Sequence, residues 1–141
     1  MEFLRIKSRE NHLKATPQRI VIYKELLRSK DHPYAEIIFH RVKKIFPDIS
    51  MDTVNRTLLT FARIGIVNVV EGNGEPRRYD PNIENHHHFR CVACNTIFDF
   101  GYSPYDELII PEDLKDRFVV RSKKVLLEGY CDKCQKKGKS L

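Results

Sequence analysis

The segment that decides the fold of the N-terminal half runs from Asp48 to Gly65 and reads DISMDTVNRTLLTFARIG. Ser50 is a favoured N-cap residue, and glycine commonly ends a helix in the left-handed conformation. Between them, apolar side chains recur at helical spacing, at Val54, Leu58 and Phe61. The segment therefore predicts a helix from Met51 to about Ile64. Its outward side chains would be Thr53, Asn55, Arg56 and Thr60.

Two further helices are expected upstream of this segment. Thr16 is a suitable N-cap, and Pro17 suits the first helical position because its missing N–H costs nothing there. A second helix should run from about Tyr34 to Phe46, where Pro47 ends it. A helix, a turn and a capped helix are typical of a helix-turn-helix.

The hydrophobic period changes downstream of Gly65. Residues 66–70 and 77–79 alternate as strands do, and Gly72-Asn-Gly74 between them suits a hairpin turn. This hairpin would be the wing of a winged helix. Residues 81–85 are polar and include a proline, which favours a hinge. We therefore assign residues 1–80 to a winged-helix DNA-binding domain and 81–85 to a hinge.

Residues 86–141 should form a small α/β domain. Strands are expected at His88–Cys91, Ile97–Phe100 and Phe118–Leu127, with a helix between Pro104 and Arg117. The basic tail from Lys133 to Lys139 is expected to be frayed. The predicted fold class is α+β, a winged helix-turn-helix followed by this smaller domain.

Composition and charge restrict the partners. Of the 141 residues, 41% are apolar and 31% are charged, and there is no apolar run of the kind that spans a membrane. We expect a soluble cytoplasmic protein with no membrane partner. Residues 1–68 carry 13 Lys or Arg and 7 Asp or Glu (+6), whereas residues 69–141 carry 12 of each (0). A polyanion such as double-stranded DNA would meet the first half, although a merely solvated basic surface has the same balance.

Four cysteines fall into two pairs with metal-ligand spacing. Cys91 and Cys94 form one C-x-x-C, and Cys131 and Cys134 form the other. In a reducing compartment two disulfides are disfavoured, and two such pairs complete a closed tetrahedral site for structural Zn(II). The alternative is four free buried cysteines.

Three consecutive histidines precede the first cysteine pair. In a strand His86 and His88 share one face, and His87 points the other way. Asp80 and Asp99 lie nearby in the sequence, and imidazole with carboxylate suits Fe(II), Mn(II) or Zn(II). Chance surface histidines are the plainer interpretation. The alternative is an open, exchangeable metal site.

Five motifs together resemble the ferric uptake regulator family. The resemblance runs from about Leu13 to Cys134, with the motifs in the family's order and spacing. They are KATPQR (14–19), HPYA (32–35), DTVNR (52–56), FARIGIV (61–67) and HHHFRCVAC (86–94).

The resemblance implies a dimeric, metal-dependent DNA-binding repressor in which residues 86–141 are the dimerisation and metal-binding domain. It implies a second, regulatory metal, Fe(II) or Mn(II), that bridges the two domains and clamps them for DNA binding. The implied ligands are His32, Asp80, His86, His88 and Asp99. An aspartate at position 99 resembles the peroxide-sensing branch, in which Fe(II) and hydrogen peroxide oxidise a ligand histidine. The expected DNA contacts are Arg19, Thr53, Asn55, Arg56 and Thr60.

Two departures and three rival functions accompany this interpretation. Asn85 and Lys123 stand where some relatives have a further metal site, so that site is expected to be absent. Asn55 stands where many relatives have tyrosine, so the operator sequence is expected to differ. The nearest rival is a ferric or zinc uptake regulator of the same family. The second rival, a metal-dependent hydrolase, leaves the basic winged helix unexplained. The third, a zinc-ribbon interaction module without regulation, would ignore the metal state of the histidine site.

Overall fold

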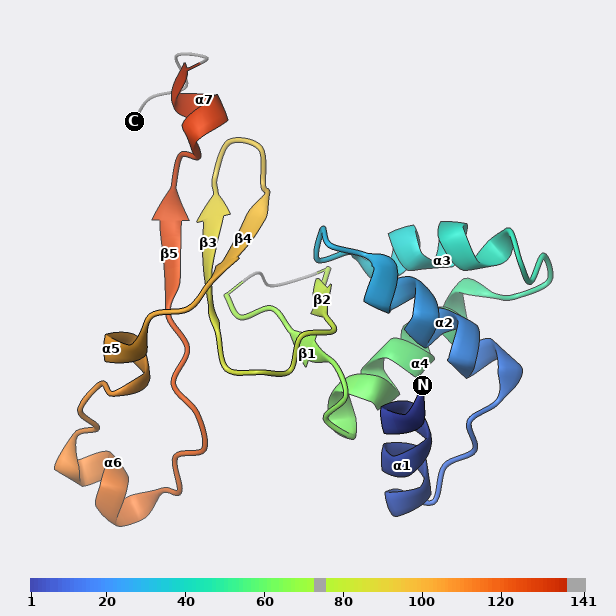
Figure 1. Ribbon diagram of the computed structural model, residues 1–141, viewed down its shortest axis with the longest axis horizontal. Helices are drawn as coiled ribbons and strands as arrows, with labels where there is room; N and C mark the ends of the chain where they lie inside the picture. The colour runs from blue at the N-terminus through green and yellow to red at the C-terminus, as the bar shows by residue number, and fades with distance from the viewer. Residues whose placement is uncertain (73–75, 137–141) are drawn as a thin grey trace. The chain divides into compact units, whose positions relative to one another are not determined.

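The structure is a computed structural model that describes residues 1–72 and 76–136 (Figure 1). The chain divides into two compact units, Met1–Ile83 and Glu84–Leu141. In the described part of the chain, no helix combines the length and the apolar character needed to cross a bilayer.

In the residues that the structure describes, the first unit contains four helices and a two-stranded antiparallel sheet. Its elements are α1 (Glu2–Glu10), α2 (Pro17–Arg28), α3 (Ala35–Lys43), α4 (Met51–Arg63), β1 (Asn68–Val69) and β2 (Tyr79–Asp80). Both caps expected from the sequence are present. Thr16 Oγ1 accepts from Arg19 N at 3.3 Å, and Ser50 Oγ accepts from Thr53 N at 3.1 Å.

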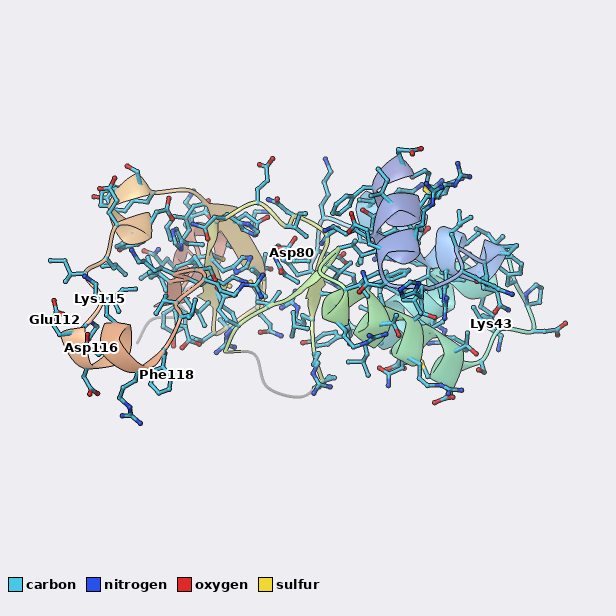
Figure 2. All side chains as sticks on the ribbon, turned by 90° about the horizontal axis from the view of Figure 1, so that it is seen from below. Lys43, Asp80, Glu112, Lys115, Asp116 and Phe118 are labelled. Atoms are coloured by element: carbon cyan, nitrogen blue, oxygen red, sulfur yellow. The ribbon has the colours of Figure 1, made fainter. Side chains whose placement is uncertain are left out.

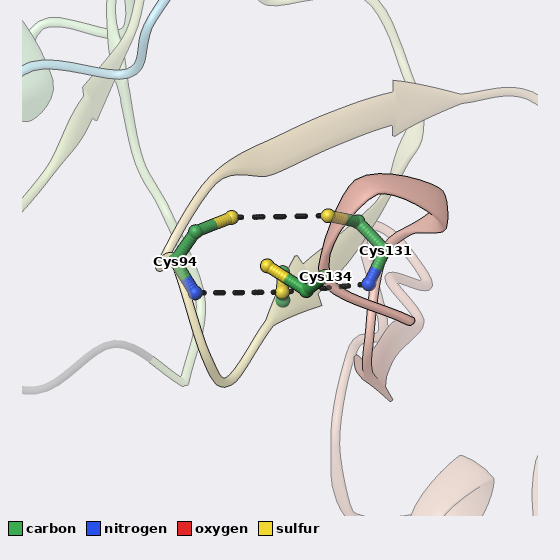
Figure 3. A group of neighbouring side chains, drawn as sticks. Cys94, Cys131 and Cys134 are labelled. Carbon is green, nitrogen blue, oxygen red and sulfur yellow. Dashed lines mark hydrogen bonds between the residues drawn. The ribbon is translucent and has the colours of Figure 1, made fainter. Parts of the chain in front are cut away.

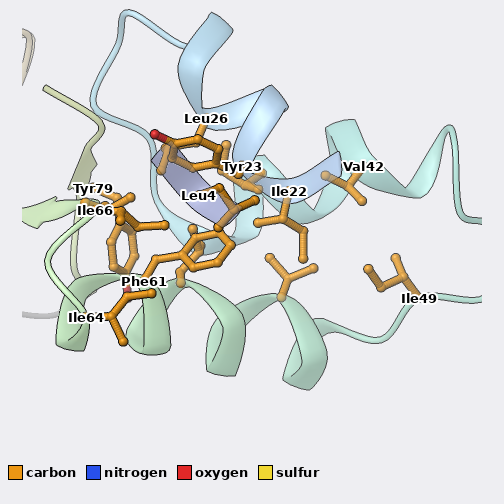
Figure 4. Close-up of a cluster of buried hydrophobic side chains, with 14 residues drawn as sticks. Leu4, Ile22, Tyr23, Leu26, Val42, Ile49, Phe61, Ile64, Ile66 and Tyr79 are labelled. Atoms are coloured by element: carbon orange, nitrogen blue, oxygen red, sulfur yellow. The ribbon is translucent and has the colours of Figure 1, made fainter. Parts of the chain in front are cut away.

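Helices α2, α3 and α4 pack around one apolar core, which also receives side chains from α1 and β2 (Figure 4). Tyr23 and Phe61 meet edge to face with ring centres 5.7 Å apart. Leu4 of α1 is fully buried in this core, although the sequence analysis assigned no helix to residues 2–10. The helix is amphipathic, with Leu4 on its buried face and charged residues such as Arg5 and Arg9 exposed to solvent.

The wing is a short ladder at the end of this unit. β1 pairs with β2 antiparallel, with Asn68 opposite Asp80 and Val69 opposite Tyr79. The expected strands are thus confirmed in type but are shorter than residues 66–70 and 77–79, and β2 extends to Asp80. The expected turn residues Asn73 and Gly74 lie outside the described residues.

The second unit is a three-stranded sheet with short helices. Its elements are β3 (His87–Cys91), β4 (Ile97–Phe100), α5 (Ser103–Asp106), α6 (Glu112–Arg117), β5 (Leu126–Gly129) and α7 (Asp132–Lys136). The strand order is β4-β3-β5, with β4 antiparallel and β5 parallel to β3. β4 returns the chain to the end of the sheet where β3 begins, and residues 101–125 lead from there to the start of β5.

Two expectations for this unit were wrong. The strand expected at Phe118–Leu127 is confined to Leu126–Gly129, because β3 offers a partner edge only to these residues, from His88 to Cys91. β-Favouring side chains at 118–120 cannot form a strand without a partner edge. The tail expected to fray from Lys133 instead has Lys133–Lys136 in α7, and residues 137–139 lie outside the described residues. The helix expected between Pro104 and Arg117 is confirmed as α6, and α5 precedes it.

Candidate metal centres and nucleic-acid interface

The four cysteines converge where β3 and β5 end. Cys91 is the last residue of β3, Cys94 follows in the turn, and Cys131 and Cys134 lie just before and within α7. One sulfur from each lies within 4.8 Å of all the others. We call these four residues the cysteine cluster.

The geometry of the cysteine cluster fits tetrahedral zinc. Cys94 Sγ and Cys131 Sγ are 3.9 Å apart (Figure 3). Zinc–sulfur bonds of about 2.3 Å place tetrahedral sulfurs about 3.8 Å from one another. The spacing and the all-sulfur donor set therefore suit Zn(II).

Local hydrogen bonds prepare one thiol for metal binding. The backbone N–H groups of Cys94 and Cys131 donate to Cys91 Sγ at 3.5 and 3.4 Å, and they lower the pKa of Cys91 to about 6. The Thr96 hydroxyl, 3.2 Å from Cys94 Sγ, lowers the pKa of Cys94. Burial raises the pKa of Cys134 to about 12. An ion must therefore displace a proton from Cys134, whereas Cys91 is close to the thiolate that metals require.

A histidine–carboxylate group lies on the sheet of the second unit. His86 Nε2 and His88 Nε2 are 3.0 Å apart, and Asp99 Oδ1 lies 3.6 and 3.1 Å from them. The β3–β4 register sets His88 opposite Asp99. Ligands at about 2.1 Å from one ion lie about 3.0 Å apart at right angles. Two imidazoles and a carboxylate suit Fe(II). We call these three residues the sheet half-site.

His87 points the other way, as the alternation of a strand requires. It is fully buried, and its Nδ1 accepts from Val125 N at 3.0 Å while Nε2 lies 2.8 Å from Asp106 Oδ1. A neutral imidazole that accepts at Nδ1 carries its proton on Nε2, which then donates to Asp106. His87 thereby joins β3 to α5 and to the residue before β5, and it is a structural histidine.

A second histidine–carboxylate pair lies within the first unit. His32 Nε2 and Asp80 Oδ2 are 3.6 Å apart, and both residues are buried. His32 stands in the loop between α2 and α3 with φ of +50°, and Asp80 is the last residue of β2. A left-handed backbone costs a non-glycine residue about 1–2 kcal/mol, so surrounding contacts must hold this loop. We call His32 and Asp80 the wing half-site.

A cleft of about 420 Å³ lies between the start of α2 and the exposed face of α4. It is lined by Thr16, Gln18, Arg19, Thr53, Arg56, Thr57 and Thr60. Four of the five expected DNA contacts therefore line it, whereas Asn55 is exposed on α4 and is not among the lining residues. Arg56 Nε is held 3.0 Å from Asp52 Oδ2.

Three lining residues were missed as contacts by the sequence analysis. Thr16 and Gln18 belong to the first turn of α2 and its cap. Thr57 lies four residues after Thr53 and three before Thr60, so helical spacing alone places these threonines on one face. That spacing was the available signal.

Comparison with known proteins identifies the family to which the chain is similar. The family model described as the ferric uptake regulator family matches residues 10–125. The chain is 35% identical over 129 residues to the peroxide-responsive repressor PerR of Staphylococcus saprophyticus, covering 92% of this chain and 87% of that protein.

Solved structures give the same result. The Campylobacter jejuni peroxide stress regulator superimposes with a TM-score of 0.68 at 30% identity, covering 95% of this chain and 100% of that one. The Helicobacter pylori ferric uptake regulator, described as having three functional metal-binding sites, gives a TM-score of 0.72 at 26% identity, covering 95% and 90%.

Proposed function

Because this chain belongs to the ferric uptake regulator family, we propose that it is a DNA-binding repressor that a metal ion activates and that peroxide inactivates. It is a regulator rather than an enzyme, in line with its peroxide-responsive relatives. One observation carries the sensing part of the proposal. Each unit contributes its own group of histidine and aspartate side chains with converging donor atoms.

The proposed regulatory site uses both half-sites for one ion. Two ligands from His32 and Asp80 are too few for a stable site, and the three of the sheet half-site leave coordination positions open. An ion that takes all five ligands would favour a single arrangement of the two units. By reciprocity, a DNA that selects the same arrangement would bind metal-loaded protein more tightly.

The peroxide response follows from the same ligands. Bound Fe(II) would supply the redox chemistry that activates hydrogen peroxide, whereas Mn(II) is far less reactive. Hydrogen peroxide would transfer one oxygen atom to the imidazole of His32 or His86, and its other oxygen would leave as water. The oxidised imidazole is a poorer ligand, so the two units separate and DNA is released. Asp99, a short carboxylate on β4, favours this branch over an uptake regulator that senses metal abundance.

Zinc in the cysteine cluster would have a structural role. The cluster has four sulfur ligands and no position for water or substrate, which is the pattern of structural zinc. Binding there would join the ends of β3 and β5 through Cys91 and Cys131. The free energy of zinc binding would then contribute to folding of the second unit.

DNA would be bound by the cleft between α2 and α4. Threonine hydroxyls beside arginine guanidinium groups suit phosphate and base-edge contacts. The first 68 residues carry all of the chain's excess positive charge, as 13 basic against 7 acidic residues. Operator titration with Arg56→Ala tests this part.

A homodimer through the second unit would cover an apolar surface left open in the single chain. Figure 2 shows Phe118 at the end of α6, pointing away from its unit. Phe118 is 52% exposed, Val119 91% and Ile109 93%. Large apolar side chains this exposed, close together in the sequence, favour an interface there. Val119→Glu should give monomers in sedimentation experiments, and a dimer of unchanged affinity would exclude this surface.

The experiment that tests the proposed function is a metal-dependent operator titration. Zinc-loaded protein, prepared without oxygen, should bind operator DNA only after Mn(II) or Fe(II) is added. Peroxide should abolish binding of the Fe(II) form alone. Binding that ignores both metal and peroxide would refute the proposal.

A further inference from the structure

Arg78 is a buried arginine that grips the loop carrying His32. Only 6% of its surface is exposed. Its Nε donates to the carbonyl oxygen of His32 at 2.7 Å, and its Nη2 donates to the carbonyl oxygen of Asp31 at 2.7 Å. Its guanidinium carbon also lies 5.3 Å from the centre of the Tyr34 ring. The guanidinium therefore holds the carbonyl oxygens of two consecutive peptide groups, one on each side of the His32 Cα, and we call this contact the Arg78 clamp.

Because Arg78 lies immediately before β2, the Arg78 clamp connects the two residues of the wing half-site, His32 and Asp80. Side chains two residues apart in extended chain share a face, so Arg78 and Asp80 point to the same side. Tyr79, between them, is 1% exposed and belongs to the apolar core. The extended segment from Arg78 to Asp80 is thus anchored in the core by Tyr79. Its Arg78 side chain holds the backbone of His32, and its Asp80 carboxylate lies 3.6 Å from the His32 ring.

Other contacts hold the same loop, one from β2 and two from α3. Tyr79 N donates to Pro33 O at 3.0 Å. Arg41 of α3 donates to Asp31 Oδ2 at 3.0 Å and to Ser29 Oγ at 2.7 Å. Burial alone would raise the pKa of Asp31, but the hydrogen bond and charge of Arg41 leave that pKa below its ordinary value. The loop is thus bonded to α3 through Arg41, and to the wing through both the Tyr79 backbone and the Arg78 side chain.

We propose that Arg78 is a positioning residue for the metal ligand His32, and that it makes the wing and the His32 loop move as one body. The proposal rests on the regulatory site proposed above. The left-handed backbone of His32 is unfavourable without external contacts, and Arg78 holds its carbonyl oxygen directly. Restraining His32 through an occupied metal site therefore also restrains the hairpin that ends at Asp80.

The test is a titration of the zinc-loaded full chain with Mn(II). The electron paramagnetic resonance signal of free Mn(II) reports how much of the ion is bound. Arg78→Gln should weaken Mn(II) binding about tenfold or more, the range typical of residues that orient a metal ligand. Arg78→Lys should fall between this variant and the wild type, because one ammonium cannot reproduce the forked contact to two carbonyls. Arg77→Gln is the matched control, since it removes the same charge from an exposed neighbour, and it should bind as the wild type does.

A double-mutant cycle separates positioning from general stability. If Arg78 acts through His32, the double variant His32→Ala/Arg78→Gln should bind Mn(II) no more weakly than His32→Ala alone. Fully additive losses, or a folded Arg78→Gln with unchanged affinity, would overturn the proposal. If Arg78→Gln does not fold, the Mn(II) affinity of Arg78→Lys is the test, and an affinity equal to that of the wild type would overturn the proposal. Unchanged affinity in His32→Ala would instead refute the regulatory site itself, so the two failures are distinguishable.

Discussion

The cysteine cluster and the two half-sites offer a metal different environments in the same chain. The cluster draws four sulfurs from one unit, and its members lie at the ends of paired strands. The half-sites offer nitrogen and oxygen donors, and neither unit has the full set of five residues. Soft thiolates in a closed set retain zinc, whereas imidazole and carboxylate exchange borderline and hard cations. The difference indicates how one small protein can have a permanent metal and a sensed one.

Of the variants considered, Cys94→Ser should have the largest effect, on zinc content and on the stability of the second unit. An incomplete thiolate set should release zinc, and a substantial part of the roughly 10 kcal/mol typical of structural zinc binding would be lost from the second unit. Metal analysis and denaturant unfolding measure both effects. Thr96→Val, which removes only the hydroxyl beside Cys94 Sγ, is the control and should keep its zinc. A zinc-free Cys94→Ser protein that is equally stable and dimeric would show that the cluster is not structural.

His86→Ala should have the opposite pattern. It removes a direct ligand of the proposed regulatory ion, so Mn(II) affinity should fall by about 100-fold, at least as much as for a residue that only orients a ligand. Zinc content and unfolding should stay as in the wild type. His40→Ala replaces an exposed histidine on α3 and should change neither. Loss of zinc from His86→Ala would mean that the two metal environments are not separate.

Arg56→Ala tests whether the exposed face of α4 binds the operator DNA. The variant should weaken operator binding by about 1–3 kcal/mol if Arg56 reads a base. If Arg56 contacts only phosphate, the loss should be equal for all sequences and the salt slope should fall by about one. Arg63→Ala, at the exposed end of α4 and outside the cleft, is the control. Unchanged affinity of Arg56→Ala at two salt concentrations would remove this face of α4 from the interface.

Asp99→Glu should have the smallest effect. It keeps the charge but lengthens the carboxylate arm opposite His88, so it should change peroxide sensitivity more than metal-dependent DNA binding. Peroxide dose curves and operator titrations of the Mn(II) form measure the two separately. Equal losses in both would show that Asp99 is only a ligand and does not set the branch.

The sequence predicts those parts of the fold that have local causes. Helices α2 and α4 could be placed because Thr16 and Ser50 cap them, and Gly65 ends α4 with φ of +84°. The alternation of His86, His87 and His88 follows from strand geometry alone. The spacing of the cysteines likewise anticipates their convergence.

Several of the parts that escaped prediction depend on contacts distant in the sequence. The strand expected at Phe118–Leu127 needed a partner edge that β3 provides only to its last residues. The clamp of Arg78 joins residues 46 and 47 positions apart, and no local pattern marks it. The role of His87 depends on Asp106, which α5 brings beside β3.

Histidine oxidation after equal peroxide doses to Fe(II)-loaded and Mn(II)-loaded protein tests the central claim most directly. Peptide mass measurement should find added oxygen on His32 or His86 in the Fe(II) form alone, together with loss of operator binding. Equal oxidation in both forms, or oxidation only at His12 or His40, would contradict peroxide sensing at this site and leave a metal-uptake regulator as the remaining interpretation.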